Sequence, residues 1–250
     1  NAIEFLVKDG IISVKNDSNV QENIETYFNE TVHTIPDEQF SPIINSHGFR
    51  GNEIIKEKPD DTFRIFTVGG STTFSVGVDD ESTWPNRLET KIHNLVPNQN
   101  VEVINAGISS ATSYVNSDLI KEKLIHFKPD LIIIYEGVNE QGCMMESFDN
   151  KNTQFSKEAI AKKCGVNAYQ DYPISLAERY SDLCDFGQMN NFELIIAFQP
   201  TVKFDGKILT NEELSSYFDR PQYPIILENY GKMVKETLSQ IKNCDTTADF

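Results

Sequence analysis

The 250-residue sequence predicts an α/β protein in which helices cover both faces of a parallel β-sheet. Two observations carry this prediction. From residue 63 onward, short and nearly continuous apolar segments alternate with longer segments of helical periodicity. Such apolar segments are typical of parallel strands, which are buried on both faces. Strands that alternate with helices form right-handed βαβ units, so we expect a three-layer α/β/α arrangement.

The apolar segments place the expected strands at Phe63–Val68, Val101–Asn105, Leu131–Tyr135 and Phe192–Phe198, and Thr246–Phe250 resembles the approach to a fifth strand. The helical patterns between them lie at Thr83–Leu95, Val115–Phe127, Ile174–Met189 and Ile225–Ile241. The second helix is expected to stop before Pro129, because a proline disfavours helical backbone in the residue that precedes it.

The chain is expected to form one α/β domain with an N-terminal arm. Residues 1–60 are polar and irregular, apart from a weak alternating segment at Ile11–Val14, and we expect them to pack on the domain formed by residues 61–250. Two longer insertions, Gln141–Asp171 and Thr201–Pro224, follow the third and fourth strands. Both fall at the carboxyl edge of the sheet, where loops shape a substrate site.

Composition excludes several classes of partner. The formal net charge is −16, whereas a protein that binds nucleic acid needs a basic surface and one that docks on anionic lipid needs basic residues. No apolar run reaches 18 residues, so no membrane span is expected within these residues. The acidity itself is explained by solubility.

The four cysteines leave two possibilities open. They form no C-x-x-C pair and no histidine cluster accompanies them, so a zinc site is not expected. Cys143 with Cys164 and Cys184 with Cys244 would make two disulfides, one across an irregular stretch and one between two helical regions. The alternative is that all four are buried free thiols.

Localisation is expected to be extracytoplasmic, either secreted or anchored outside these residues. Two N-x-[ST] sequons begin at Asn16 and Asn29, which is compatible with export. The sequence begins at Asn1 without a methionine and shows no signal peptide, which indicates a processed or trimmed start.

The most informative stretch is the end of the first strand, where Gly69 and Gly70 precede Ser71. The carboxyl ends of parallel strands are where α/β sheets place ligands and chemistry. Two glycines leave the backbone free to adopt a positive φ and leave room for a substrate to approach. Ser71 is therefore a candidate nucleophile at the strand end. The simpler interpretation of the same residues is that they only form a turn.

Two further strand ends supply groups that match this serine. Asn105-Ala106-Gly107 follows the second strand, and Gly137-Val138-Asn139-Glu140 follows the third. All three ends emerge at one edge of a parallel sheet, so a hydroxyl, a glycine N–H and a carboxamide are expected to converge. Acyl transfer needs such donors where negative charge develops on the tetrahedral intermediate. We predict that the N–H groups of Ser71 and Gly107 and the side-chain amide of Asn139 form an oxyanion hole.

With these blocks the chain resembles the SGNH, or GDSL-type, hydrolases. Gly70-Ser71-Thr72-Thr73, the glycine at 107 and Gly137-Val138-Asn139-Glu140 correspond to three ordered blocks of the family, and Asn45–Gly51 resembles the lead-in of a secreted or membrane-associated branch. The resemblance covers roughly residues 45–250. It implies a flavodoxin-like α/β/α fold and a serine esterase, lipase or acyltransferase activity without a metal or organic cofactor. Gly70 and Glu140 depart from the family's pattern, which has aspartate at both positions.

The general base is the main departure from the family, which carries it in a late Asp-x-x-His block. The four histidines are His33, His47, His93 and His126, all before residue 130, and Ala248 stands three residues after Asp245. A serine needs an adjacent base to be a good nucleophile. Either the chain stops before the Asp-x-x-His segment, which would then lie beyond residue 250, or it is a degenerate member that binds without cleaving. His93 and His126 are expected to be structural or surface residues, and His47 lies on the arm, which could fold over the strand ends.

Other sequence features allow weaker alternatives. Glu136 and Glu140 are spaced as paired carboxylates for glycosidic cleavage, although loop charges that orient their neighbours are the simpler interpretation. The glycine-rich turn lacks the lysine of a phosphate-binding loop and the spacing of a dinucleotide site. Trp84, Tyr114 and Tyr135 are candidates for a pocket lining or for the core.

The sequence therefore predicts a serine hydrolase that cleaves short acyl esters or carbohydrate O-acyl esters through an acyl-enzyme on Ser71. Small-molecule or carbohydrate esters are the expected partners. Transfer of the acyl group to a sugar hydroxyl, an O-acyltransferase activity, is a close variant. A non-catalytic binding or structural module on the same scaffold is the alternative from a different class.

Overall fold

The computed structural model describes residues 41–140, 148–149, 154–155, 172–200, 210–211, 223–244 and 246–249. The weak segment Ile11–Val14, both sequons, Cys143 and Cys164 lie outside these residues, as does most of the two insertions. The structure therefore tests the α/β unit and the last part of the predicted arm.

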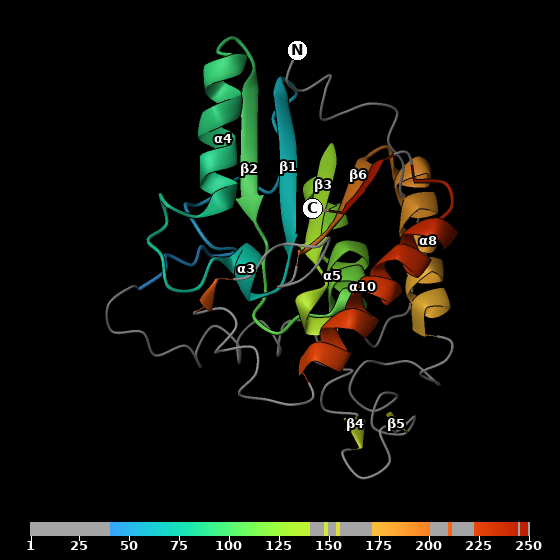
Figure 1. Ribbon diagram of the computed structural model, residues 1–250. Helices are drawn as coiled ribbons and strands as arrows, with labels where there is room; N and C mark the ends of the chain where they lie inside the picture. The colour runs from blue at the N-terminus through green and yellow to red at the C-terminus, as the bar shows by residue number, and fades with distance from the viewer. Residues whose placement is uncertain are drawn as a thin grey trace.

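The sheet has five strands: β1 (Thr62–Gly69), β2 (Asn100–Asn105), β3 (Leu131–Glu136), β6 (Glu193–Phe198) and β7 (Thr246–Asp249). They lie in the order β2-β1-β3-β6-β7 (Figure 1), and all four pairings are parallel. This is the flavodoxin-like order of doubly wound sheets. The four strands predicted from apolar runs are confirmed to within one residue at each end, and so is the fifth. A separate antiparallel pair joins β4 (Phe148–Asp149) to β5 (Gln154–Phe155).

The helices are α3 (Ser71–Phe74), α4 (Trp84–Leu95), α5 (Ser113–Glu122), the 3₁₀ turn η1 (Leu124–Phe127), α8 (Tyr172–Asn190) and α10 (Tyr223–Gln240). The single helix expected at Val115–Phe127 is two pieces, because Lys123 leaves helical geometry at φ −122° and ψ −57°. η1 then ends before Pro129 as expected, with Lys128 in the left-handed region. In the described part of the chain, no helix combines the length and apolarity that crossing a membrane requires.

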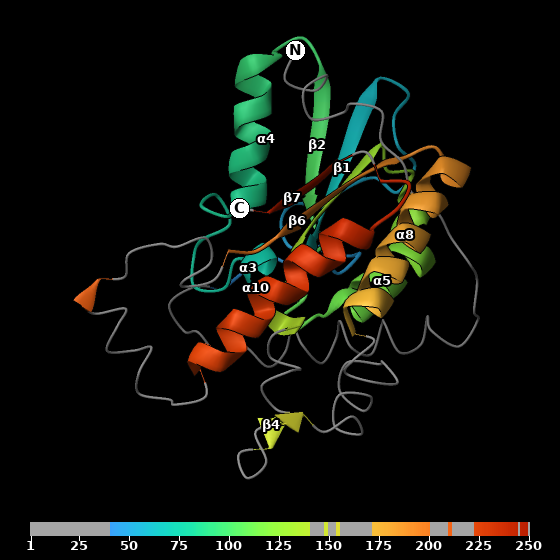
Figure 2. The ribbon, with the colours of Figure 1, turned by 45° about the vertical axis from the view of Figure 1, so that its right-hand side comes forward.

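The core is divided by the sheet into two layers, as alternation along the strands requires. On one face Ile65, Val101 and Leu131 pack with Ile92 of α4. On the other face the alternate strand residues pack against α5, α8 and α10, whose contributions include Leu119, Leu183 and Val234. Figures 1 and 2 show α4 on one side of the sheet and the other three helices together on the opposite side. The predicted three-layer arrangement is confirmed.

The described end of the predicted arm packs firmly on the α/β unit. Phe49 is fully buried and makes edge-to-face contacts with Phe66 and Phe127. Arg64 of β1 is also fully buried and donates to the carbonyls of Ile55, Lys56 and Phe127 and to the Glu102 carboxylate. These bonds satisfy a buried guanidinium and tie the segment before β1 to the amino end of the sheet.

A disulfide joins Cys184 of α8 to Cys244, which follows α10, with 5.3 Å between the Cα atoms. One of the two predicted pairings is therefore confirmed, and free thiols are the wrong alternative for these two cysteines. The bond crosses 60 residues of sequence and ties together two helices on the same face of the sheet.

Replacing both cysteines, Cys184→Ala/Cys244→Ala, is expected to lower the free energy of unfolding by about 2–4 kcal/mol, because a 60-residue loop is no longer closed in the unfolded chain. Urea unfolding followed by circular dichroism measures the change. An unfolding midpoint equal to that of the wild type would contradict a stabilising bond at this place.

Candidate active site

Ser71 is the first residue of the one-turn helix α3, directly after the end of β1. Its N–H is one of the helix N-terminal groups that no carbonyl of the same helix accepts. Among the described residues, its hydroxyl has no hydrogen-bond partner, and the side chain is half-buried. Both groups are thus available for a ligand at the carboxyl edge of the sheet.

The two glycines before Ser71 are required for different reasons. Gly69 has φ +156°, and a Cβ there would overlap the Tyr135 carbonyl and the Thr73 hydroxyl. Gly70 has φ −83°, so the expected positive φ is wrong at this position. A Cβ at residue 70 would instead overlap Nδ2 of Asn139, the end of a flexible side chain, so a larger residue there would require that amide to shift.

The loop after β2 continues along β1 beyond the end of the ladder. The Ala106 N–H donates to the Thr67 carbonyl at 2.9 Å, and the Ile108 N–H donates to the Gly69 carbonyl at 2.9 Å. These bonds carry the chain past the tip of β1 to Ala111, which is fully buried. The carbonyl of Ala111 then becomes a fixed acceptor beside α3.

Asn139 connects this acceptor to the loop after β3. Its Nδ2 donates to the Ala111 carbonyl at 2.7 Å and lies against Gly70. The structure therefore brings the ends of β1, β2 and β3 together around the Asn139 carboxamide. One hydrogen of the amide is used by Ala111, and the second is left as a donor.

Gly107 lies in the same cluster with its N–H already engaged. It donates to Oδ1 of Asn105 at 3.0 Å, and its Cα packs on the backbone of Thr73 and Phe74, where a Cβ would overlap. Its close packing explains the glycine. A contribution of this N–H to an oxyanion hole stays a prediction and requires that the Asn105 bond be shared.

The described histidines are placed away from Ser71. His47 stacks edge-to-face on Phe127, 5.0 Å between ring centres, and Phe127 lies just before the amino end of β3. His93 has its Nε2 2.8 Å from the Val101 carbonyl, also at the amino end of a strand, and His126 is exposed on η1. The interpretation of His93 and His126 as structural or surface residues is confirmed, and His33 lies outside the described residues.

Arg50 holds the segment that follows Ser71, a role that sequence reasoning missed. Its side chain is 3% exposed and donates to the carbonyls of Phe74, Ser75 and Val78 at 2.6–2.8 Å. Its Nε pairs with Asp80 at 2.7 Å. The first two carbonyls are at the C-terminal end of α3, where the helix has no further N–H to donate to them, so the guanidinium completes the turn.

Gln199 is a second residue that the sequence argument missed. It follows β6, is 5% exposed, and contacts the loops after β1 and β3 through its carboxamide. The same logic that singled out the first three strand ends applies to the fourth, so the signal was present in the sequence.

Glu136 and Glu140, which flank Asn139 in the sequence, form a buried pair, 2% and 1% exposed. Glu136 accepts from Nδ2 of Asn116, Glu140 accepts from the N–H of Ser113, and the other oxygen of each has no hydrogen-bond partner among the described residues. Burial, and for Glu136 also its neighbour Glu140, raises the pKa of each carboxyl, while Arg179 opposes the rise. They orient their neighbours as expected, but no sugar can reach them, so the glycosidase alternative is wrong.

The three aromatic candidates have different environments. Trp84 and Tyr135 contact each other edge-to-face at 5.9 Å, and Trp84 packs against the α4-side core. Tyr114 is 46% exposed, with the Arg179 guanidinium 5.2 Å from its ring centre. Trp84 is thus a core residue, whereas Tyr114 lies on the surface at the start of α5.

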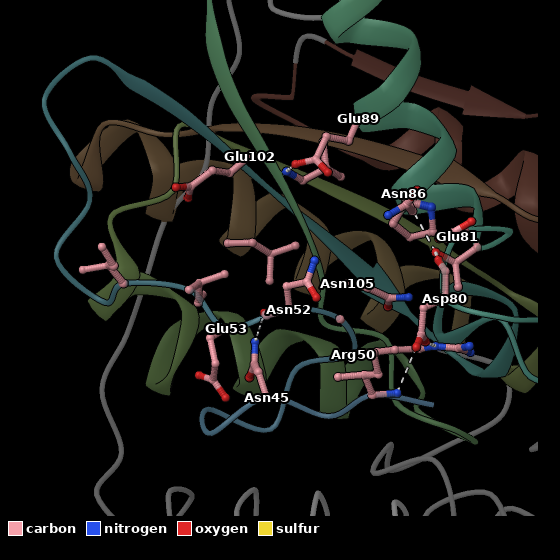
Figure 3. A pocket seen from close by; sticks show the side chains of 18 residues that line it. Asn45, Arg50, Asn52, Glu53, Asp80, Glu81, Asn86, Glu89, Glu102 and Asn105 are labelled. Carbon is pink, nitrogen blue, oxygen red and sulfur yellow. Dashed lines mark hydrogen bonds and ion pairs between the residues drawn. The ribbon is translucent and has the colours of Figure 1, made fainter. Parts of the chain in front are cut away.

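A cavity of about 470 Å³ lies between the segment before β1, β2 and α4 (Figure 3). Its lining includes five carboxylates, those of Glu53, Asp80, Glu81, Glu89 and Glu102. Arg50 reaches it beside Asp80, and Ser71, Gly107 and Asn139 are not part of its lining. Within the described ranges, no three His, Cys, Asp or Glu residues are grouped so as to hold a metal ion.

The strand order and the meeting of three loops define the class: a flavodoxin-like α/β protein with a polar site at the carboxyl edge of its sheet. No protein-family model and no curated protein matches the chain. Among solved structures it is similar to TesA, with a TM-score of 0.46 and 16% identity, over 74% of this chain and 76% of that one.

Two further similar structures are esterases by their descriptions. AlinE4, an SGNH-hydrolase family esterase, has a TM-score of 0.39 and 19% identity over 69% of this chain and 75% of that one. A variant of Axe2, an acetyl xylan esterase from Geobacillus stearothermophilus, has a TM-score of 0.45 and 18% identity over 75% and 76%. SGNH is the family whose motifs the sequence resembles.

Arg50→Lys is expected to destabilise the fold by about 3 kcal/mol, because an ammonium group cannot reach the three carbonyls and Asp80 together and leaves buried acceptors unpaired. Urea unfolding measures it, with Arg87→Lys on the exposed face of α4 as the matched control. Equal losses in the two variants would rule out a special role for Arg50.

Glu136→Gln is expected to reduce the loss of unfolding free energy that accompanies a rise in pH. A carboxyl whose pKa is raised by folding stabilises the protein below its unfolded pKa of about 4.3, and that contribution is lost as the pH rises through the folded value. The glutamine of this variant cannot ionise and removes the repulsion on Glu140. The difference in unfolding free energy between pH 5 and pH 8 should therefore be smaller in this variant than in the wild type.

Glu178→Gln, at an exposed position of α8, serves as the control for this measurement and should reproduce the wild-type pH dependence. A Glu136→Gln variant whose stability follows the wild-type curve between pH 5 and pH 8 would show that the pair does not repel.

Proposed function

We propose that the protein is a serine hydrolase of carboxylic esters with Ser71 as its nucleophile. The observation that carries the proposal is the position of Asn139, whose Nδ2 lies against Gly70 and donates to the Ala111 carbonyl. A carboxamide fixed in this way, beside a serine whose hydroxyl has no partner among the described residues, supplies a preorganised donor where charge develops during acyl transfer.

In the proposed reaction, Ser71 Oγ attacks the acyl carbon and the carbonyl oxygen takes up the negative charge. The Ser71 N–H and the second Nδ2 hydrogen of Asn139 donate to this oxygen, and Gly107 joins them when its N–H is shared. The alcohol leaves as the acyl-enzyme forms, and water then releases the acid. Donors that are fixed beforehand are worth more than mobile ones, because they do not reorganise during the reaction.

We propose that the base is an Asp-x-x-His pair on a segment that follows β7. In the register of the sheet Asp249 lies opposite Phe198, so β7 ends beside the residue that precedes Gln199. A segment that continues from this point starts at the edge where Ser71 lies. The aspartate would orient the histidine, which takes the serine proton and returns it to the leaving alcohol.

The substrate class and setting are part of the proposal. Short acyl esters or O-acylated carbohydrates are the proposed substrates, and transfer to a sugar hydroxyl in place of water is the close variant. An extracytoplasmic location is supported by the Cys184–Cys244 disulfide, since such bonds persist in oxidising compartments.

A binding module without catalysis is the second candidate. It is favoured by the positions of His47 and His93, which are engaged at the amino end of the sheet and cannot activate Ser71 from there. On this alternative the Asn139 cluster would bind an ester or a carboxylate without cleaving it.

The proposal is tested by incubating the longest native form of the protein with a serine-directed fluorophosphonate and with p-nitrophenyl acetate. Labelling at Ser71, its loss in Ser71→Ala, and a fall of about 10²–10³ in kcat for Asn139→Ala are expected. On this proposal the 250 residues by themselves should be nearly inactive, because the proposed base lies outside them.

Two results would contradict this assignment. A folded wild-type protein that is not labelled at Ser71 would favour the binding module. Rapid ester turnover by the 250-residue chain, lost in His47→Ala, would show that the base is His47. Ser239→Ala, on the exposed face of α10, provides a serine control that should keep full activity.

A further inference from the structure

Gln199 is the point where four segments at the carboxyl edge are joined. Its backbone N–H donates to the Glu136 carbonyl at 2.7 Å, and its own carbonyl accepts from the Tyr230 hydroxyl of α10 at 2.9 Å. Its Oε1 accepts from the Val138 N–H at 3.1 Å, and its Nε2 donates to the Thr72 hydroxyl. All the polar groups of the residue are therefore used, two by the scaffold and two by the loops of the candidate site.

The orientation of the carboxamide follows from the chemistry of its partners. A backbone N–H can only donate, so the oxygen of the carboxamide must face Val138. The nitrogen is then directed to Thr72, whose hydroxyl can accept. With the backbone of Gln199 held on both sides and its side chain 5% exposed, the carboxamide has no other arrangement that pairs both of its ends.

The two partners of this carboxamide are next in sequence to Ser71 and Asn139, the proposed nucleophile and oxyanion donor. Thr72 follows Ser71 in α3, and Val138 precedes Asn139. Among the described residues, Gln199 is the only one that hydrogen-bonds both to α3 and to the segment Val138–Glu140, while the Asn139 amide is held separately by the Ala111 carbonyl. Arg50 and Thr73 hold α3 on the loop after it and on the Tyr135 carbonyl, and neither bonds to the segment Val138–Glu140.

We propose that Gln199 is a positioning residue that sets the distance between the Ser71 hydroxyl and the Asn139 amide. The inference rests on the proposed function for its catalytic consequence. A nucleophile displaced by about 1 Å from its oxyanion donors loses up to about 10² in rate, while substrate binding by the surrounding loops is little changed. The effect is therefore expected in kcat and not in KM.

The test compares Gln199→Met, Thr72→Val and the double variant in the longest native form of the protein. Methionine keeps the length of the side chain but makes neither bond, and Thr72 is exposed, so Thr72→Val breaks the link without disturbing the core. Each single variant should lose about tenfold in kcat with KM within about twofold, and the double variant should lose no more than Gln199→Met. Thr72→Ser, which keeps the hydroxyl, should retain the wild-type kcat that Thr72→Val loses.

Gln188→Met, at an exposed position of α8, is the matched control and should match the wild type. A wild-type kcat in Gln199→Met would overturn the inference. So would a loss in Gln199→Met that Thr72→Val does not share, because Gln199 would then act by supporting the fold alone.

Hydrogen exchange separates this inference from the proposed function. Loss of the link should speed exchange of the Val138 amide and of the α3 amides by at least about tenfold in Gln199→Met, whether or not the protein is an esterase. Unchanged exchange would overturn the positioning role. An unlabelled Ser71 in the wild type would instead overturn the proposed function, and the exchange result would still decide whether Gln199 holds the two loops together.

Discussion

A parallel sheet ends all of its strands at one edge, and the backbone groups beyond that edge have no further ladder to complete them. In this protein they are satisfied in two ways. The loop after β2 prolongs the ladder along β1 through Ala106 and Ile108. Elsewhere side chains take over: Arg50 donates to carbonyls of the segment after Ser71, and Gln199 accepts the Val138 N–H. Because buried backbone groups must be paired, the same bonds that complete the loops also fix where Ser71 and Asn139 lie.

Buried charge is compensated to different degrees at the two ends of the sheet. Arg64 and Arg50 are both buried, and each is surrounded by carbonyls and one carboxylate, so their desolvation is compensated. Glu136 and Glu140 are buried beside each other and oppose each other's ionisation, with Arg179 the cation that acts on both. A pair of this kind is most stable with at least one proton bound. The carboxyls anchor α5 through Ser113 and Asn116, so the titratable pair connects this helix to the segment that carries Asn139.

The strands could be predicted from the sequence because continuous apolar runs of this length, bounded by turn residues, are typical of strands that helices cover on both faces. The convergence of Gly70 and Asn139 followed from the parallel topology alone. The break at Lys123 could not be predicted, since the helical pattern of α5 continues through it into η1. Arg50 was missed for a related reason: its partners are backbone carbonyls more than 20 residues away, and no side-chain pattern records them. Gln199 differs from Arg50, because its place directly after β6 can be predicted from the sequence in the same way as the ends of the first three strands. A glutamine there only suggests a chemical role less clearly than a serine does.

The departure of Gly70 from the family's pattern has a physical basis in the Asn139 contact. The carboxamide nitrogen occupies the place where a Cβ at residue 70 would stand. Any side chain at that position would require the end of the flexible Asn139 side chain to shift. An aspartate at 70 and Asn139 in its observed position therefore exclude each other. Glycine at 70 leaves the amide in place without any adjustment of Asn139, so the chain departs from the motif at a contact that belongs to the site.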